Sequence, residues 1–281
     1  MTLKYKFDRP VEGIDVSKYQ GAIDWPAVAG SGVKHAMLRI GYGRYDHQID
    51  QTFATNYKAA RTAGVAVGGY WYSYATSTAQ AEAEAQCCLR AIRGKQFELP
   101  IAYDIEYEPG ILALTNTQRT ALVHTFLGAI ERAGYYGILY ASTDFIKNRL
   151  NWRELARYDV WAAQYAGKCT CPLPYGIWQY TSSGNVPGIA GRVDCNWLYK
   201  DYPAIIKGAG LNGYSKGECG QPGGDGSNAE QDRPPENLPQ EPDKPLQFYR
   251  VDIESYMTIG DANDIVALAE SRGLKAIATV V

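Results

Sequence analysis

The chain has 281 residues, of which 46% are hydrophobic and 21% are charged, and its formal net charge is −2 at pH 7. This composition is that of a globular protein with room for one large domain and a small one. No stretch approaches the ~18 consecutive apolar residues of a membrane span, and the net charge is close to zero. We therefore expect neither membrane insertion nor a nucleic-acid partner.

Residues 1–210 alternate between short β-rich runs and helical stretches. Helical periodicity predicts three long helices, at Asp50–Ala63, Ser77–Arg93 and Thr115–Ala133. Beyond about residue 158 the β-rich runs follow one another too closely for another helix of that length. The runs predict eight strands, at Val11–Val16, His35–Gly41, Val65–Ser73, Leu99–Glu106, Gly137–Ala141, Val160–Tyr165, Ile177–Thr181 and Arg192–Asn196.

Eight strands, with helices mainly in the first five units, predict an α/β fold: an irregular (β/α)-barrel with a helix-poor final third. Active sites of such barrels lie at the C-terminal ends of the strands. Polar residues at those ends are therefore the candidates for a functional site.

The composition changes after residue 210, which ends the predicted barrel domain 1–210. Residues 211–245 are rich in Gly and Pro and are predicted to be a flexible linker. Residues 246–281 predict a strand, a helix and a strand, a small βαβ-like unit that is too short for an adequate core of its own. This C-terminal unit would pair with another copy, pack elsewhere or begin a longer module.

Two carboxyl groups stand two residues apart at the end of the fourth predicted strand, at Asp104 and Glu106. Because alternate strand residues share a face, both point the same way. Such a pair suits cleavage of a glycosidic bond, since one carboxyl can stay ionised while burial keeps its neighbour protonated. The same spacing recurs at Asp252 and Glu254, which we interpret as a solvated strand face because no other acidic strand end converges on it.

Two further carboxyl groups, Asp15 and Asp194, lie between apolar neighbours near the ends of the first and eighth predicted strands. These strands adjoin in a closed barrel, so the four acidic residues are predicted to ring one mouth of the barrel. A ring of like charges is unfavourable for folding and is rarely required by structure alone. The four residues are therefore the predicted catalytic site.

An ordered set of motifs resembles glycoside hydrolase family 25, the Chalaropsis-type lysozymes, over about residues 10–203. The set is Gly13-Ile-Asp-Val-Ser-Lys-Tyr-Gln-Gly21, Asp104-Ile-Glu106, Trp178-Gln-Tyr-Thr-Ser182 and Val193-Asp-Cys-Asn196. The resemblance implies an irregular β/α barrel. It also implies an N-acetylmuramidase that cuts the β-1,4 bond between N-acetylmuramic acid and N-acetylglucosamine in bacterial peptidoglycan.

By the same resemblance, Glu106 corresponds to the general acid. Asp104 corresponds to the partner that stabilises the transition state or orients the acetamido group of the substrate, and Asp15 and Asp194 to the further acids of the site. Retention by substrate assistance and inversion by an activated water both remain open. No metal or other cofactor is expected.

Aromatic side chains at strand ends are predicted to be sugar platforms, because they combine an apolar face with a polar group. Arg39 and Gln164 are candidates to hydrogen-bond the substrate or to anchor the carboxylates. The predicted platforms are Tyr70, Tyr72, Tyr140, Trp161 and Trp178.

The N-terminal residues lack the apolar core of a secretory signal. Together with the linker and the small C-terminal unit, this resembles a phage or prophage endolysin. Such a protein is made in the bacterial cytoplasm and acts on the wall after holin-type release, or it is secreted. Residues 246–281 would then bind the cell wall or drive self-association through exposed strand edges.

Two other interpretations compete with the muramidase. The first is a related glycosidase that acts on another N-acetylated glycan such as chitin, but the Asp-x-x-Asp-x-Asp-x-Glu run of chitinases is absent from residues 99–106. The second is a non-catalytic sugar-binding barrel, which predicts the loss of a key carboxylate, whereas all four are present.

The cysteine pattern favours reduced thiols. The alternative is one disulfide among Cys169, Cys171 and Cys195.

Overall fold

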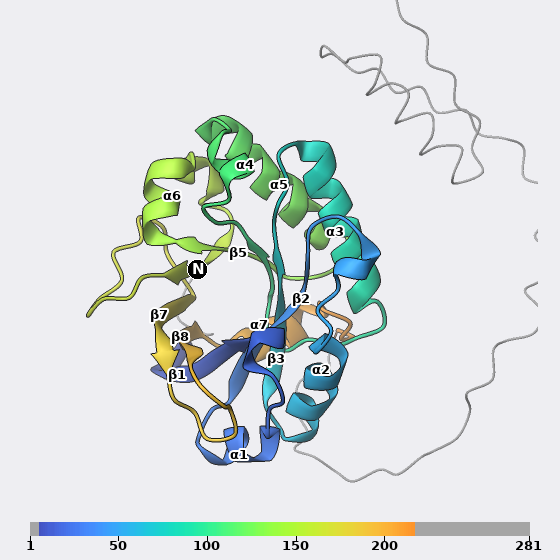
Figure 1. Cartoon of the computed structure of the whole chain (residues 1–281), viewed down its shortest axis with the longest axis vertical. Helices are drawn as coiled ribbons and strands as arrows, with labels where there is room; N and C mark the ends of the chain where they lie inside the picture. Colours follow the sequence, from blue (N-terminus) through green and yellow to red (C-terminus); the bar gives the residue numbers. More distant parts are fainter. Residues whose placement is uncertain (1–5, 217–281) are drawn as a thin grey trace, which may run out of the picture. The chain divides into compact units, whose positions relative to one another are not determined.

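The structure is a computed structural model that describes residues 6–216 (Figure 1). Eight strands close into a barrel in chain order, so the predicted α/β barrel is confirmed. The strands are Lys6–Val16 (β1), His35–Tyr42 (β2), Ala66–Tyr72 (β3), Ile101–Asp104 (β4), Gly137–Ser142 (β5), Asp159–Ala163 (β6), Ile177–Gly184 (β7) and Val193–Lys200 (β8). The predicted C-terminal unit, with Asp252 and Glu254, lies outside the described residues.

One strand of the barrel runs against the others. Strands β1 to β7 are parallel to one another, whereas β8 is antiparallel to both β7 and β1. A two-stranded hairpin forms across a short connection, whereas a parallel pair needs a longer crossover. The N-terminal end of β8 therefore meets the C-terminal ends of the other strands at one mouth. Asp194, predicted to lie near the end of its strand, is instead the second residue of β8.

The three long helices predicted from the sequence are present as α2, α3 and α5. Two begin at residues that cap them: the side chain of Ser77 accepts a hydrogen bond from Gln80 N, and Thr115 forms a capping box with Gln118. The helices are Trp25–Gly30 (α1), Phe53–Thr62 (α2), Thr78–Ile92 (α3), Pro109–Leu112 (α4), Asn116–Arg132 (α5), Thr143–Arg149 (α6) and Tyr202–Ala209 (α7).

Helices surround the barrel unevenly. The side of the barrel that carries β7 and β8 has no helix beside it (Figure 1), and the predicted helix-poor final third is confirmed. Short 3-10 turns add to the connections, at Lys18–Gln20, Asp46–Gln48 and Trp152–Leu155. Within residues 6–216, no helix has the length and apolar character that crossing a membrane requires.

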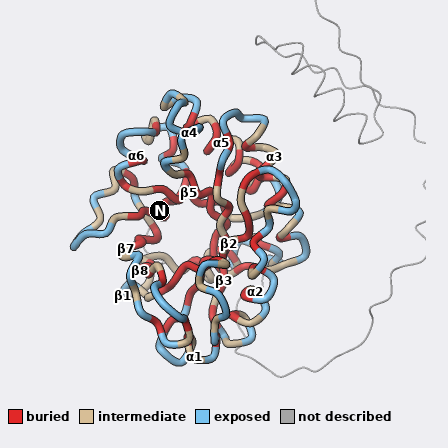
Figure 2. Tube along the Cα trace, viewed as in Figure 1, coloured by how far each residue is buried: buried red, intermediate tan, exposed pale blue. Residues whose placement is uncertain are grey.

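Buried residues form two groups, one on each face of the strands, and Figure 2 shows buried positions along the strands of the barrel. Residues such as Ile14, Ile101 and Tyr103 pack outward against the helices. Alternate residues point into the barrel, where Met37 and Ile138 are among those that fill its interior. Period-two alternation thus gives each strand an apolar outer face and leaves its inner face free to carry polar groups at the mouth.

The end of the barrel opposite the mouth is closed by α7 and the residues that follow it. Asn212 is fully buried, and its side-chain amide donates to the carbonyls of Phe97 and Leu99 (3.2 and 2.8 Å). Its Oδ1 accepts from the backbone N–H of Tyr136 at 2.7 Å. The packed chain therefore continues beyond residue 210, where the sequence predicts the linker to begin.

Candidate active site

The four predicted carboxyl groups line one cavity of about 240 Å³ at the barrel mouth, here called the carboxyl cavity. Asp15 of β1 and Asp194 of β8 are paired directly opposite each other, and opposite residues of an antiparallel pair share a face. Asp104 ends β4, and Glu106 follows two residues later on the same side. The structure thus brings these four side chains together.

Asp15 is held by two buried amides. Its Oδ2 accepts hydrogen bonds from Gln179 Nε2 and Asn196 Nδ2, both at 2.9 Å. Burial, and then the charge of Asp194, raise the pKa of Asp15 to about 8, although the two hydrogen bonds act in the opposite direction. Burial also raises the pKa of Asp194. The Asp15–Asp194 pair therefore holds a proton at neutral pH.

The second pair, Asp104 and Glu106, is also poised to hold a proton. Asp104 is only 4% exposed, and its Oδ1 makes no hydrogen bond within the protein. Burial, followed by the charge of Glu106, holds the pKa of Asp104 well above its usual range. Burial also raises the pKa of Glu106. The two carboxyl groups are hydrogen-bonded to each other, so they titrate as a pair that can share one proton.

Arg39 supplies the positive charge that lines the carboxyl cavity. Its Nε donates to Asp50 Oδ2 at 2.7 Å, and its guanidinium lies 4.9 Å from the ring centre of Tyr19. The Nη2 of Arg39 is buried without a hydrogen-bond partner in the protein. Buried polar groups are normally paired, so this donor and the Oδ1 of Asp104 mark positions for polar groups of a ligand.

Four predicted sugar platforms line the carboxyl cavity: Tyr70, Tyr72, Tyr140 and Trp161. The indole of Trp161 meets Tyr140 edge-on, with ring centres 4.5 Å apart, and Tyr70 at 5.9 Å. The hydroxyl of Tyr72 donates to Glu108 at 2.7 Å. The aromatic rings therefore form a packed wall beside the acids.

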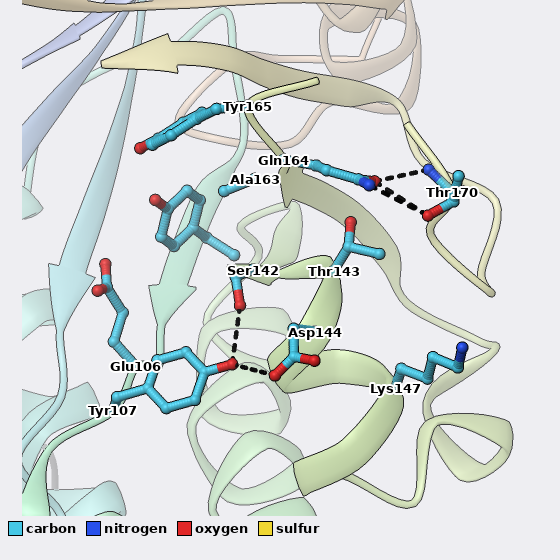
Figure 3. A pocket seen from close by; sticks show the side chains of 11 residues that line it. Glu106, Tyr107, Ser142, Thr143, Asp144, Lys147, Ala163, Gln164, Tyr165 and Thr170 are labelled. Carbon is cyan, nitrogen blue, oxygen red and sulfur yellow. Dashed lines mark hydrogen bonds between the residues drawn. The ribbon is translucent and has the colours of Figure 1, made fainter. Parts of the chain in front are cut away.

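A second cavity of about 440 Å³, here called the side cavity, shares lining residues with the first, and Figure 3 shows the side chains that line it. Glu106, Tyr140 and Tyr165 line both cavities. In Figure 3, Glu106 and Tyr165 lie on one side of the side cavity, and Lys147 and Thr170 lie on the other. The acid Glu106 thus stands where the two cavities meet.

Gln164 lines the side cavity rather than the carboxyl cavity. Its Oε1 accepts from the backbone N–H of Thr170 at 2.7 Å, which anchors the loop between β6 and β7 (Figure 3). The substrate contact predicted for Gln164 would therefore lie in the side cavity. The amide of Gln164 is already hydrogen-bonded to Thr170.

Trp178, also predicted to be a sugar platform, lines neither cavity. Its neighbours Ile177 and Gln179 point into the barrel, so alternation turns Trp178 outward. The indole N–H donates to the backbone carbonyl of Gln164 at 2.8 Å. Its position corrects the prediction, because the ring lies on the wrong face of β7 to contact a ligand among the four acids.

Two buried residues of the site, Gln179 and Asn196, are not among the residues predicted from the sequence, and they are 2% and 1% exposed. The period-two rule that pairs Asp104 with Glu106 also places Asn196 beside Asp194 on one face of β8. Gln179 carried a weaker signal, as a polar residue between two aromatic ones.

No metal site is evident in the part of the chain that the structure describes. Within residues 6–216, no group of three or more His, Cys, Asp or Glu side chains is arranged to hold a metal ion. The cysteines of this part, including Cys169, Cys171 and Cys195, are free thiols.

Known proteins resemble the chain over this barrel. The model of the family described as glycosyl hydrolases family 25 matches residues 14–189. Lysozyme M1 of Streptomyces globisporus is 29% identical over 202 residues, which cover 66% of this chain and 67% of that protein.

Solved structures are also similar to the chain over the barrel. The bacterial lysozyme from Streptomyces coelicolor is 25% identical with a TM-score of 0.61, and the match covers 68% of this chain and 93% of that one. The modular autolysin LytC from Streptococcus pneumoniae is 27% identical with a TM-score of 0.61. That match covers 68% of this chain but 47% of LytC, so the chain spans about half the length of the autolysin. LytC has also been solved in complex with a synthetic peptidoglycan ligand.

Proposed function

The chain belongs to family 25 of the glycosyl hydrolases, whose model matches more than half of it, and from this premise we propose that it is an N-acetylmuramidase. It would cleave the β-1,4 bond between N-acetylmuramic acid and N-acetylglucosamine in bacterial peptidoglycan. The observation that carries the proposal is the convergence of four carboxyl groups on one cavity. A buried cluster of acids suits a reaction that needs a proton donor and a nearby negative charge.

Glu106 is the proposed general acid. Burial raises the pKa of Glu106, which is the direction that a donor of a proton to the oxygen of the leaving sugar requires. The side chain is half-buried and lines both cavities, so it can reach a glycosidic oxygen that lies between them.

Asp104 is the proposed stabilising carboxylate. When Glu106 holds the proton of the pair, Asp104 carries the negative charge that faces the oxocarbenium-like centre. Its unpaired Oδ1 can accept a hydrogen bond from the acetamido N–H of the reacting sugar. Arg39 Nη2, an unpaired polar atom on a second residue that lines the carboxyl cavity, is placed to donate to a substrate oxygen.

The two cavities suggest how the glycan lies. Positive charge develops on the sugar whose anomeric carbon reacts, so this sugar belongs in the carboxyl cavity. The proton goes to the oxygen beyond that carbon, above Glu106, and the leaving sugar then enters the side cavity. Tyr140 and Tyr165, which line both cavities, would contact the chain on either side of the scissile bond.

The biological setting follows from the same proposal. We expect an enzyme of the endolysin or autolysin type, whose release to the wall takes a holin-type or secretory route. Attachment to the wall or self-association through residues 246–281 stays a prediction, because these residues lie outside the described structure.

Turbidity of a cell-wall suspension tests the catalytic assignment. Glu106→Gln should abolish clearing, whereas Glu154→Gln, an exposed glutamate outside both cavities, should clear at the parent rate. Clearing by Glu106→Gln at the parent rate would refute the role of Glu106.

Mass spectrometry of the digest tests which bond is cut. Fragments with N-acetylmuramic acid at the reducing end are expected, and fragments with N-acetylglucosamine there would overturn the proposal. Release of reducing ends from chitin at a rate equal to that from peptidoglycan would favour the alternative glycosidase.

A further inference from the structure

Gln179 and Asn196, together called the amide clamp, are buried beside the acids, and Gln179 lines the carboxyl cavity whereas Asn196 does not. We propose that the amide clamp is a pair of positioning residues that act through Asp15. The clamp holds one oxygen of the Asp15 carboxyl as an acceptor and so places the proton of the Asp15–Asp194 pair on the other oxygen. The inference rests on the proposed function only for its activity readout.

The orientation of Asn196 is fixed by a partner that can only donate. The indole Nε1 of Trp161 lies 2.7 Å from Asn196 Oδ1, and an indole N–H has no acceptor capacity. The oxygen of the Asn196 amide must therefore face Trp161, and its nitrogen must face Asp15.

The orientation of Gln179 is set by two hydroxyl groups. Tyr140 and Tyr165 both donate to Gln179 Oε1 at 2.9 Å. With its oxygen occupied in this way, Gln179 directs its amide nitrogen to Asp15 Oδ2. The clamp thus extends from the buried Trp161 to Tyr165, which is 58% exposed.

Two amide donors on a single oxygen determine where the proton of Asp15 sits. Asp15 Oδ2 accepts both hydrogen bonds, so protonation of this oxygen would break one of them. The proton therefore occupies Oδ1, from which Asp15 donates to Asp194, its direct partner across the strand pair. Asp194 remains the anionic member of the pair, in a fixed orientation.

The clamp also influences the pH at which Asp15 ionises, because hydrogen bonds from amides stabilise the carboxylate. Ionisation would remove the hydrogen bond to Asp194 and set two adjacent carboxylates against each other. Activity should therefore fall on the alkaline side as Asp15 loses its proton. The charged and titratable groups facing Asp15 are Asp194, Glu106, Asp104, Tyr70, Tyr140, Tyr165, Cys195 and Arg39.

The pH profile of kcat/KM in Asn196→Ala and Gln179→Ala tests the proposal. Loss of a donor disfavours the anion and raises the pKa of Asp15, so the alkaline limb should move up by about half to one pH unit. The maximal rate should fall on the order of tenfold because Asp15 is no longer held. Gln86→Ala, an amide on α3 outside both cavities, should change neither quantity.

A merely structural role would lower activity without moving the alkaline limb, and that result would overturn the proposal. Thermal unfolding of each variant identifies loss of fold, and Gln179→Ala serves if Asn196→Ala does not fold.

Infrared titration of protonated carboxyl groups gives a readout that does not depend on activity. It uses the Glu106→Gln background, and the Asp15 band is identified by its loss in Asp15→Asn. Adding Asn196→Ala should shift the titration of that band to higher pH, and an unshifted band would refute the clamp. Because this measurement needs no substrate, failure of the clamp and failure of the muramidase assignment give different results.

Discussion

Asp15 and Asp194 face each other directly across the antiparallel pair of β1 and β8, at the mouth of an otherwise parallel barrel. Ionisation of both acids is unfavourable in this arrangement, because the site is buried and the two negative charges would repel each other. The pair therefore behaves as one proton-holding unit rather than as two independent carboxylates.

The stability of the fold should depend on Asp15. The pKa of Asp15 is raised from an ordinary aspartate value to about 8 in the folded chain, so the folded state binds the proton more tightly than the unfolded state. This contribution is fully favourable below about pH 4 and is lost as the pH rises towards 8. Asp15→Asn, which mimics the neutral acid, should thus exceed the parent at pH 8 by on the order of 2–5 kcal/mol in unfolding free energy.

Urea unfolding at pH 4 and pH 8 checks this prediction. The two proteins should have similar unfolding free energies at the lower pH. Equal stabilities at pH 8 would show that Asp15 is not held neutral.

Glu108 should tune the proposed general acid. The charge of Glu108 contributes to raising the pKa of Glu106, after burial. Glu108→Gln removes this charge, so Glu106 should lose its proton at lower pH. The titration of the Glu106 carboxyl, followed by infrared spectroscopy and identified by the loss of its band in Glu106→Gln, should then move down by less than about one pH unit. A titration that moves up, or not at all, would contradict this coupling.

Arg39 should act mainly on substrate binding. Arg39→Lys keeps a positive charge but lacks the planar group that reaches both Asp50 and the cavity. We expect KM for peptidoglycan fragments to rise about tenfold, with a smaller change in kcat. Steady-state kinetics with a soluble fragment separate the two quantities, and a loss confined to kcat would place Arg39 in the chemistry instead.

The side cavity should matter only for substrates with a sugar as leaving group. Tyr107 lines this cavity and donates to Asp144 at 2.6 Å (Figure 3). Tyr107→Ala should raise KM for a peptidoglycan oligomer several-fold and leave cleavage of an aryl glycoside, whose leaving group is small, near the parent rate. Equal losses on both substrates would show that the side cavity does not hold the leaving sugar.

Much of the barrel could be predicted because its strands are short apolar runs with clear boundaries. The family resemblance seen in the motifs is confirmed by the family match over residues 14–189. The short helices α1, α4, α6 and α7 were not predicted, since helices of four to eight residues show too little periodicity.

At the site, the sequence predictions were wrong about the direction of one strand and about the strand face on which one side chain lies. The reversed direction of β8 depends on its pairing with both neighbours, which its own sequence does not encode. The face on which Trp178 lies depends on which residues of β7 point inward, and a shift of one residue exchanges it with Gln179. The sequence therefore indicated the acids but not the amides that hold them.

Asn212 has a consequence for how the barrel is made during synthesis. Asn212 is the hydrogen-bond partner of the carbonyls of Phe97 and Leu99 and of the backbone amide of Tyr136, and it is synthesised more than 70 residues after them. Strand β1 likewise cannot pair with β8, one of its two neighbours, until β8 has been synthesised. Contacts this distant in sequence slow folding, so a nascent chain should gain its protease resistance late and abruptly, once residue 212 has left the ribosome.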